Sequence, residues 1–195
     1  FKNLSSTGAN WSSSTDASNT SKAWSSAIAF GASTSFAKTA SYGVWPVRAG
    51  QAGALAEVPM SGQLTSYATG SVGDDGAFQK GIAWPSPRFS VVSSGSGTVV
   101  TDNLTGLMWA GDAGMPTVGL CTGGTSTAWQ SALNYVACLN GLAYLNYSDW
   151  RLPNLNELES LVHVEYTRET SCGGPCTSPG AWLNSQGFSN ATAEY

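Results

Sequence analysis

Charge is what this sequence has least of. Asp, Glu, Lys and Arg make up 10% of its 195 residues, whereas a typical soluble domain carries about 25%. The net charge is -4 and Lys and Arg never cluster, so the attraction that supplies most nucleic-acid affinity is missing, and we expect no nucleic-acid partner. Surfaces with little charge tend to associate. The composition therefore favours a protein whose surface is covered by neighbouring subunits or by sugars.

Long apolar runs and histidines are also scarce. No stretch approaches the roughly 18 to 20 apolar residues that span a bilayer, so we expect no membrane insertion. His163 is the single histidine in the sequence, and without a second one there is no evident metal pair or nucleophile system. We interpret His163 as structural. The sequence predicts a protein that is not an enzyme and that requires no cofactor.

The cysteines are even in number, which predicts disulfides in a chain of extracellular character. Three connectivities are open to the four residues, which are Cys121, Cys138, Cys172 and Cys176. We favour Cys121 with Cys138 and Cys172 with Cys176, because the Gly-Gly-Pro turn at 173–175 can close the smaller ring. A four-cysteine zinc site is the alternative. The expected location is extracellular or at the cell surface.

Strands are predicted in two regions. Gly-rich turns between β-branched runs predict a meander with strands at 89–92, 98–101 and 107–109. In the first 50 residues, aromatic residues mark shorter strands at 24–30, 36–39 and 42–47. Small residues, Gly and Pro then predict a linker that ends at Pro59.

Two helices are predicted after the meander. The first is capped by Ser126 or Thr127, contains Trp129 and ends at Gly141. The second begins after Asn154, with Glu157 placed for a capping box. Its expected buried stripe consists of Leu155, Leu158, Leu161 and Val162. Each helix has one apolar face, so we expect both to lie on a sheet.

Three motifs follow one another in this part of the chain. They are Thr-Asp-Asn-Leu-Thr-Gly-Leu-Met-Trp at 101–109, the helix around Trp129, and Ser-Asp-Trp-Arg-Leu-Pro-Asn at 148–154 with Glu157 close behind. Together they resemble the Lcl C-terminal domain family of bacterial secreted and surface proteins. The resemblance implies an α+β, C-type-lectin-like fold, related also to the formylglycine-generating enzyme, with two helices on small twisted antiparallel sheets. The structural motif residues are Trp109, Asp149, Trp150, Arg151, Pro153, Asn154 and Glu157.

The closing motif of that family resembles the opposite end of this chain. Trp-Ser-Ser at 11–13, the strand at Trp24 and Tyr-Gly-Val-Trp-Pro-Val-Arg at 42–48 look like it. We therefore predict that residues 1–51 are the closing half of a lectin-like domain and complete a preceding repeat or a neighbouring subunit. Residues 52–59 are the linker and 60–195 the opening and central part. The predicted strands between modules carry Trp11, Trp24, Trp45 and Arg48.

This order allows three arrangements: a tandem array, a subunit that gives its closing strands to a neighbour, or a circular permutant. The first two build filaments, because head-to-tail exchange has no symmetry that closes it. The sequence thus predicts a structural subunit or repeat of an extracellular bacterial filament or surface array, with copies of itself as partners. The alternative is a surface adhesin module that binds polysaccharide or a host glycan.

Metal and sugar sites are left open. Acidic turn residues such as Asp74, Asp75, Asp102 and Asp112 suit calcium, but Asp also favours turns through local hydrogen bonds. The expected core tryptophans are Trp24, Trp45, Trp109, Trp129 and Trp150. A sugar would then stack on Trp84, Trp182, Tyr144 or Tyr147. Asp149 and Arg151 are expected to form a buried pair around Trp150.

Overall fold

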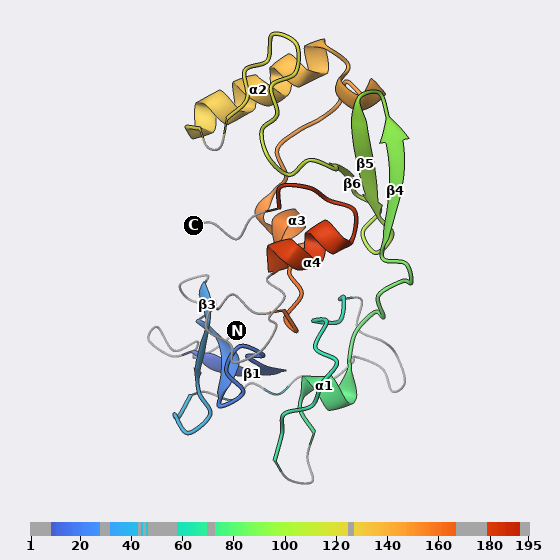
Figure 1. Ribbon diagram of the computed structural model, residues 1–195. Coiled ribbons are helices and arrows are strands. Elements are labelled where there is room, and N and C mark those ends of the chain that lie inside the picture. Colours follow the sequence, from blue (N-terminus) through green and yellow to red (C-terminus); the bar gives the residue numbers. More distant parts are fainter. Residues whose placement is uncertain are drawn as a thin grey trace. The chain divides into compact units, whose positions relative to one another are not determined.

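The chain forms two compact units with an α+β composition. The computed structural model describes residues 9–27, 32–42, 44, 46, 58–69, 73–124, 127–166 and 179–191. Unit 1 contains Phe1–Trp84 and His163–Cys176, and unit 2 contains Pro85–Val162 and Thr177–Tyr195. Each unit has one three-stranded antiparallel sheet (Figure 1). The predicted α+β class with small antiparallel sheets is confirmed.

The sheet of unit 1 has the order β1-β2-β3, with strands β1 (Asn10–Thr15), β2 (Lys22–Ala27) and β3 (Ala32–Ala37). Asp16 stabilises the turn after β1 by accepting bonds from the amide and the hydroxyl of Ser18 at 3.0 and 2.5 Å. The strand predicted at 24–30 corresponds to β2. The prediction of 36–39 was wrong in its bounds, because pairing with β2 begins at Ala32 and ends at Ala37.

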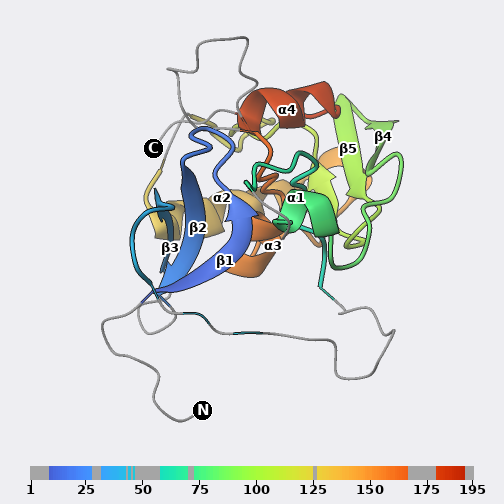
Figure 2. The same cartoon turned by 90° about the horizontal axis from the view of Figure 1, so that it is seen from below.

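The other described residues of unit 1 are largely irregular. Its helix α1 (Asp75–Phe78) is a single turn, and Figure 2 shows it beside the end of β1. His163 is buried, with its ring 4.5 Å from that of Trp84 and 4.6 Å from that of Tyr166. This packing agrees with a structural role. Among its described residues, the buried polar or charged ones are Thr15, Asp16, Ser25, Gln63 and His163.

The sheet of unit 2 is the predicted meander, which is confirmed. Its strands are β4 (Phe89–Ser94), β5 (Gly97–Asp102) and β6 (Met108–Ala110). Gly95 has φ 58° in the tight turn between β4 and β5, a conformation in which a side chain would be strained. The turn therefore depends on glycine.

The described residues of unit 2 form four helical segments: α2 (Trp129–Gly141), the 3-10 turn η2 (Tyr144–Asn146), α3 (Leu155–Ser160) and α4 (Pro179–Ser185). The predicted end of α2 at Gly141 is confirmed, but its N-cap is Ala128 rather than Thr127; Ser126 lies outside the described residues. The capping box of α3 is confirmed, since Glu157 N donates to Asn154 Oδ1 at 3.0 Å and Asn154 N to Glu157 Oε2 at 2.7 Å.

The core of unit 2 is apolar. Phe89 on β4 packs edge-on against Trp182 and Phe188, at centroid distances of 5.9 and 5.4 Å. The buried apolar residues are Phe89, Val99, Val100, Cys121, Leu139, Leu145, Trp182 and Phe188. A disulfide joins Cys121 to Cys138 on α2, which is the pairing favoured from the sequence. Cys172 and Cys176 lie outside the described residues.

The predicted burial of the α3 stripe was largely wrong, and so was the predicted burial of Trp129. On and just after α3, Leu155, Leu158 and Val162 are 68%, 49% and 56% exposed, and Trp129 is 72% exposed. α3 is held by its capping box and by a bond to Ser160 O rather than by burial. Trp129 begins α2 at the helix end away from β4 and β5 (Figure 1). Trp182, on which the sequence allowed a sugar ring to stack, is buried instead.

Candidate functional site

Unit 2 contains an open groove of about 650 Å³, which we call the unit 2 groove. Its walls are mainly apolar and come from β6 with the loop after it, from α2, and from the loop that leads into α3. Among its lining residues are Met115, Leu139, Leu158, Leu161, Leu183 and Phe188. This volume falls within the range of about 300–1,000 Å³ that is common for binding sites.

Trp150 fixes the central wall of the groove. The Asn140 side chain donates to Trp150 O and accepts from Trp150 N, both at 2.8 Å. The indole Nε1 donates to Tyr144 O at 2.8 Å, and the Tyr147 ring stands edge-on to the indole at 5.8 Å. These bonds tie the Asp-Trp-Arg motif to the C-terminal end of α2. Tyr147 is partly exposed, so this wall presents an aromatic ring to solvent.

Arg151 pairs with Glu157 and not with Asp149, so the predicted Asp149–Arg151 pair was wrong. Its guanidinium reaches both carboxylate oxygens of Glu157, at 2.8 and 2.6 Å, while Asp149 is exposed. The bond from Arg151 and that from the Asn154 amide lower the pKa of Glu157 from 4.5 to about 2. Arg151 pairs with Glu157 because Glu157, the third residue of α3, faces back toward the motif, where it also accepts a bond from Asn154 N.

Asp112 and Asp149 are two acidic residues that line the groove, and we call this pair the acidic rim. Asp112 Oδ1 accepts from Gly114 N and Asn190 Nδ2, each at 2.9 Å. Burial, and then the negative charge of Asp112, raise the pKa of Tyr144, another lining residue.

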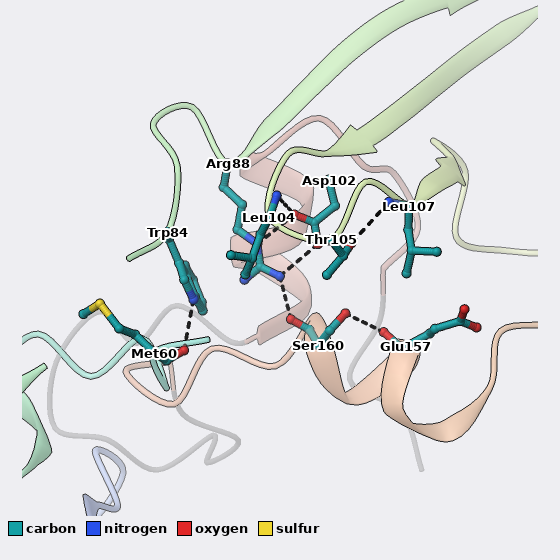
Figure 3. Close-up of polar contacts among 9 residues, drawn as sticks. All are labelled: Met60, Trp84, Arg88, Asp102, Leu104, Thr105, Leu107, Glu157 and Ser160. Atoms are coloured by element: carbon teal, nitrogen blue, oxygen red, sulfur yellow. Dashed lines mark hydrogen bonds and ion pairs between the residues drawn. The ribbon is translucent and has the colours of Figure 1, made fainter. Parts of the chain in front are cut away.

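A buried ion pair supports the strand and loop that lead to the groove (Figure 3). Arg88 binds both oxygens of Asp102, at 3.3 and 3.1 Å, and donates to Ser160 O at 2.6 Å. Asp102 also accepts from Leu104 N at 3.0 Å and from Thr105 Oγ1 at 3.1 Å. The Asp of the Thr-Asp-Asn-Leu motif is thus the anchor of its own turn. Arg88 was not predicted as a site residue; the signal was an arginine directly before a buried strand, since a buried cation needs a carboxylate.

Unit 1 has a polar centre that joins β1 to residues 61–75, which we call the Asp74 hub. Asp74 Oδ2 accepts from Thr15 Oγ1 and Gln63 Nε2, both at 3.1 Å, and from Tyr67 N at 3.0 Å. Gln63 Oε1 accepts from Thr15 N at 2.7 Å. Next to it, Asp75 Oδ2 accepts from Ser14 Oγ at 3.0 Å and also from Ser61 Oγ.

The hub carries a strongly acidic carboxylate. Burial alone would raise the pKa of Asp74, but its hydrogen bonds, led by the one from Tyr67 N, outweigh burial and lower the pKa from 3.8 to about 2. The carboxylate is therefore charged at all ordinary pH values. It attaches the first strand of the chain to the segment before α1.

The predicted site residues fall into three groups. Six of the motif residues line the groove, namely Trp109, Asp149, Trp150, Arg151, Pro153 and Glu157, and Asn154 caps the adjoining helix. Trp11 and Trp24 lie on β1 and β2, and the Trp11 ring meets Tyr42 at 5.0 Å. Trp45, Arg48, Cys172 and Cys176 lie outside the described residues.

In the described ranges, no cluster of three or more His, Cys, Asp or Glu side chains is placed to hold a metal ion. Calcium binding stays a prediction. Across the same ranges, no helix has the length and apolar character needed to cross a membrane.

Comparison with known proteins gives one match. A family model, the Lcl C-terminal domain, matches residues 98–195, which is half of the chain. The matched range includes every residue that lines the unit 2 groove. Neither curated proteins nor solved structures match the chain.

Proposed function

Because the chain belongs to the Lcl C-terminal domain family, we propose that it is a structural subunit or repeat of an extracellular bacterial filament or surface array. Its copies join head to tail by strand sharing or tandem repetition. A C-type-lectin-like completion of unit 2 by closing strands, and the absence of catalysis, are parts of this proposal.

One observation carries the proposal: the two units have complementary deficits of apolar packing. Among the described residues of unit 1, Ala9 is the single buried apolar side chain, although a three-stranded sheet usually needs an apolar face to be stable. Unit 2 has an apolar core but leaves the α3 stripe exposed and the groove open. Association between copies would cover the exposed apolar residues of unit 2 and would give unit 1 the apolar packing that it lacks.

The edge of the unit 1 sheet also favours association. β3 is the sequence Ala-Ser-Thr-Ser-Phe-Ala, which has no charge and no proline, and it pairs on one side with β2. Soluble proteins usually protect such an edge with Lys, Pro or a bulge, because an unprotected edge recruits further strands. The edge of β3 is suited to pairing with another copy.

The first test is electron microscopy of the untreated protein together with its mass after boiling in detergent with reductant. Filaments whose denatured chain runs at many multiples of about 20 kDa would indicate a tandem array. Filaments that dissociate to a 20.1 kDa chain would indicate strand exchange. A monodisperse particle of single-chain mass without filaments would overturn the proposal.

A matched pair of variants tests the role of the β3 edge. Thr34→Lys places a charge on an exposed position of β3, and Thr39→Lys places the same charge on an exposed position after the strand. We expect Thr34→Lys to reduce assembly and Thr39→Lys to leave it unchanged. Equal effects of the two variants would argue against edge pairing.

An adhesin module that binds polysaccharide is the second candidate. The observation in its favour is the partly exposed Tyr147 ring beside Trp150 at the groove, because sugar rings stack on aromatic faces. A glycan screen separates the two functions. Absence of binding would weaken the adhesin candidate and leave assembly intact.

A further inference from the structure

The unit 2 groove has the features of a surface that receives a peptide segment. It is open and mainly apolar. One of its lining residues, Leu158, also belongs to the exposed stripe of α3, so the groove and the stripe form one apolar surface. Its aromatic wall is rigid, because Trp150 is fixed through its amide, its carbonyl and its indole nitrogen. A groove fixed in this way does not need to be ordered when it binds.

The acidic rim suits a cationic partner. Asp112 and Asp149 line the groove, and the two cationic side chains described in unit 2 are each already bonded to a carboxylate of that unit: Arg88 to Asp102 and Arg151 to Glu157. The part of the chain that contains the groove is acidic overall, because residues 60–195 contain ten Asp or Glu and four Lys or Arg.

The closing half has the opposite charge. Residues 1–51 contain four Lys or Arg and a single Asp. Within this half, Tyr42 is held against Trp11 and Phe36, at centroid distances of 5.0 and 4.6 Å. Two residues on, Val44 is 78% exposed, and it opens the sequence Val-Trp-Pro-Val-Arg at 44–48. A largely apolar sequence that ends in a cation matches an apolar groove with an acidic rim.

We propose that the unit 2 groove of one copy binds residues 44–48 of a second copy, with the apolar side chains against the groove walls and Arg48 at the rim formed by Asp112 and Asp149. This assignment rests on the proposed function and deepens it, because it names the donor segment and the acceptor surface. A copy that donates at one end and accepts at the other propagates without closing.

A photo-crosslinker placed at Val44 tests the contact directly. Val44 is exposed, so its replacement by benzoyl-phenylalanine leaves the packing of the closing half unchanged. Isotopically labelled and unlabelled full-length chains are mixed in equal amounts, allowed to assemble, irradiated and analysed by mass spectrometry. We expect crosslinks between labelled and unlabelled chains at groove residues such as Met115, Tyr147 and Leu158. Crosslinks within single chains, or at residues outside the groove, would overturn the assignment.

A charge swap gives an independent test. Asp149→Lys and Arg48→Asp are each expected to raise the concentration needed for assembly about tenfold, and the double variant should restore most of the loss. The control is Glu159→Lys, because Glu159 is an exposed carboxylate on α3 that does not line the groove. A merely structural effect of either single variant would not be rescued by the other.

The outcomes separate the two proposals. Filaments whose crosslinks lie outside the groove, or whose formation is unaffected by the charge variants, would overturn the groove assignment and leave the filament function intact. Protein that stays monomeric at every concentration would overturn both. A neutral oligosaccharide that binds in the groove without competing with assembly would also overturn the assignment, since one groove cannot hold both occupants.

Discussion

The two units bury different kinds of side chain. In unit 2 the buried set is mostly apolar and is completed by one ion pair and one disulfide. In the described part of unit 1 it is almost entirely polar, and strand β1 is attached through the Asp74 hub. Apolar burial is the larger and less directional source of stability, whereas a hydrogen bond contributes about 0.5–1.5 kcal/mol net.

This difference bears on the exchange of strands between copies that we propose. A polar hub is specific in geometry but weak in net energy, a property that suits such an exchange. The apolar core and buried ion pair of unit 2 would lose much more stabilising free energy if their contacts were separated. Substitutions at the Asp74 hub should therefore weaken unit 1, and substitutions at the buried ion pair or the disulfide should weaken unit 2.

The largest effect is expected for Asp102→Ala. Asp102 is fully buried, and its loss leaves Arg88, whose side chain is 4% exposed, without its carboxylate. Removing one partner of such a pair costs about 3–5 kcal/mol. Urea unfolding followed by residue-resolved hydrogen exchange should show β4–β6 losing protection. Asp149→Ala is the control, because that carboxylate is exposed; equal loss in both variants would refute the role of the pair.

Replacing both Cys121 and Cys138 with serine should have the next largest effect. The bond spans a sequence separation of 17, and a loop of about this length is stabilised by about 3 kcal/mol. The loss should appear in α2 and in the loop around residue 121, with β1–β3 unchanged. A uniform loss across both units would contradict the view that unit 2 carries its own stability.

Gln63→Ala should weaken unit 1 alone. Gln63 is 1% exposed and bonds Thr15 N, Thr65 O and Asp74 Oδ2, so its truncation should cost about 2 kcal/mol. We expect faster exchange in β1 and unchanged exchange in β5. Gln130→Ala, on the exposed face of α2 with one bond to Asn134, is the matched control and should have almost no effect.

Local patterns predicted the elements of unit 2 well. The meander 89–109, the end of α2 at Gly141 and the capping box at Asn154 are set by residues close in sequence, and all three are confirmed. Burial was predicted less well. Periodicity identifies an apolar face but not what covers it, and three of the four stripe residues of the second helix proved to be exposed.

The supporting residues of the site depend on long-range contacts and were not predictable. Arg88 meets Ser160 across 72 positions, and Thr15 meets Gln63 across 48. Local spacing contains no information about such pairs. The Asp149–Arg151 pair shows the converse error, because neighbours in sequence were paired when the competing carboxylate at Glu157 had the better geometry.

The smallest expected effect comes from acid, and it compares the two units in one titration. Asp74 in unit 1 and Glu157 in unit 2 have pKa values of about 2, lowered from 3.8 and 4.5. A carboxylate whose pKa is depressed by folding stabilises the folded state above its unfolded pKa, and this stabilisation is lost as pH falls toward the folded pKa. Stability should hence be constant above about pH 5 and decline between about 4.5 and 2. Glu157→Gln removes the response of α3, and Asp74→Asn that of β1, when both are followed by NMR. Because Glu157 lies at an exposed ion pair and Asp74 anchors a buried glutamine, the decline at β1 should exceed that at α3; the reverse order would show that the hub is not what holds β1.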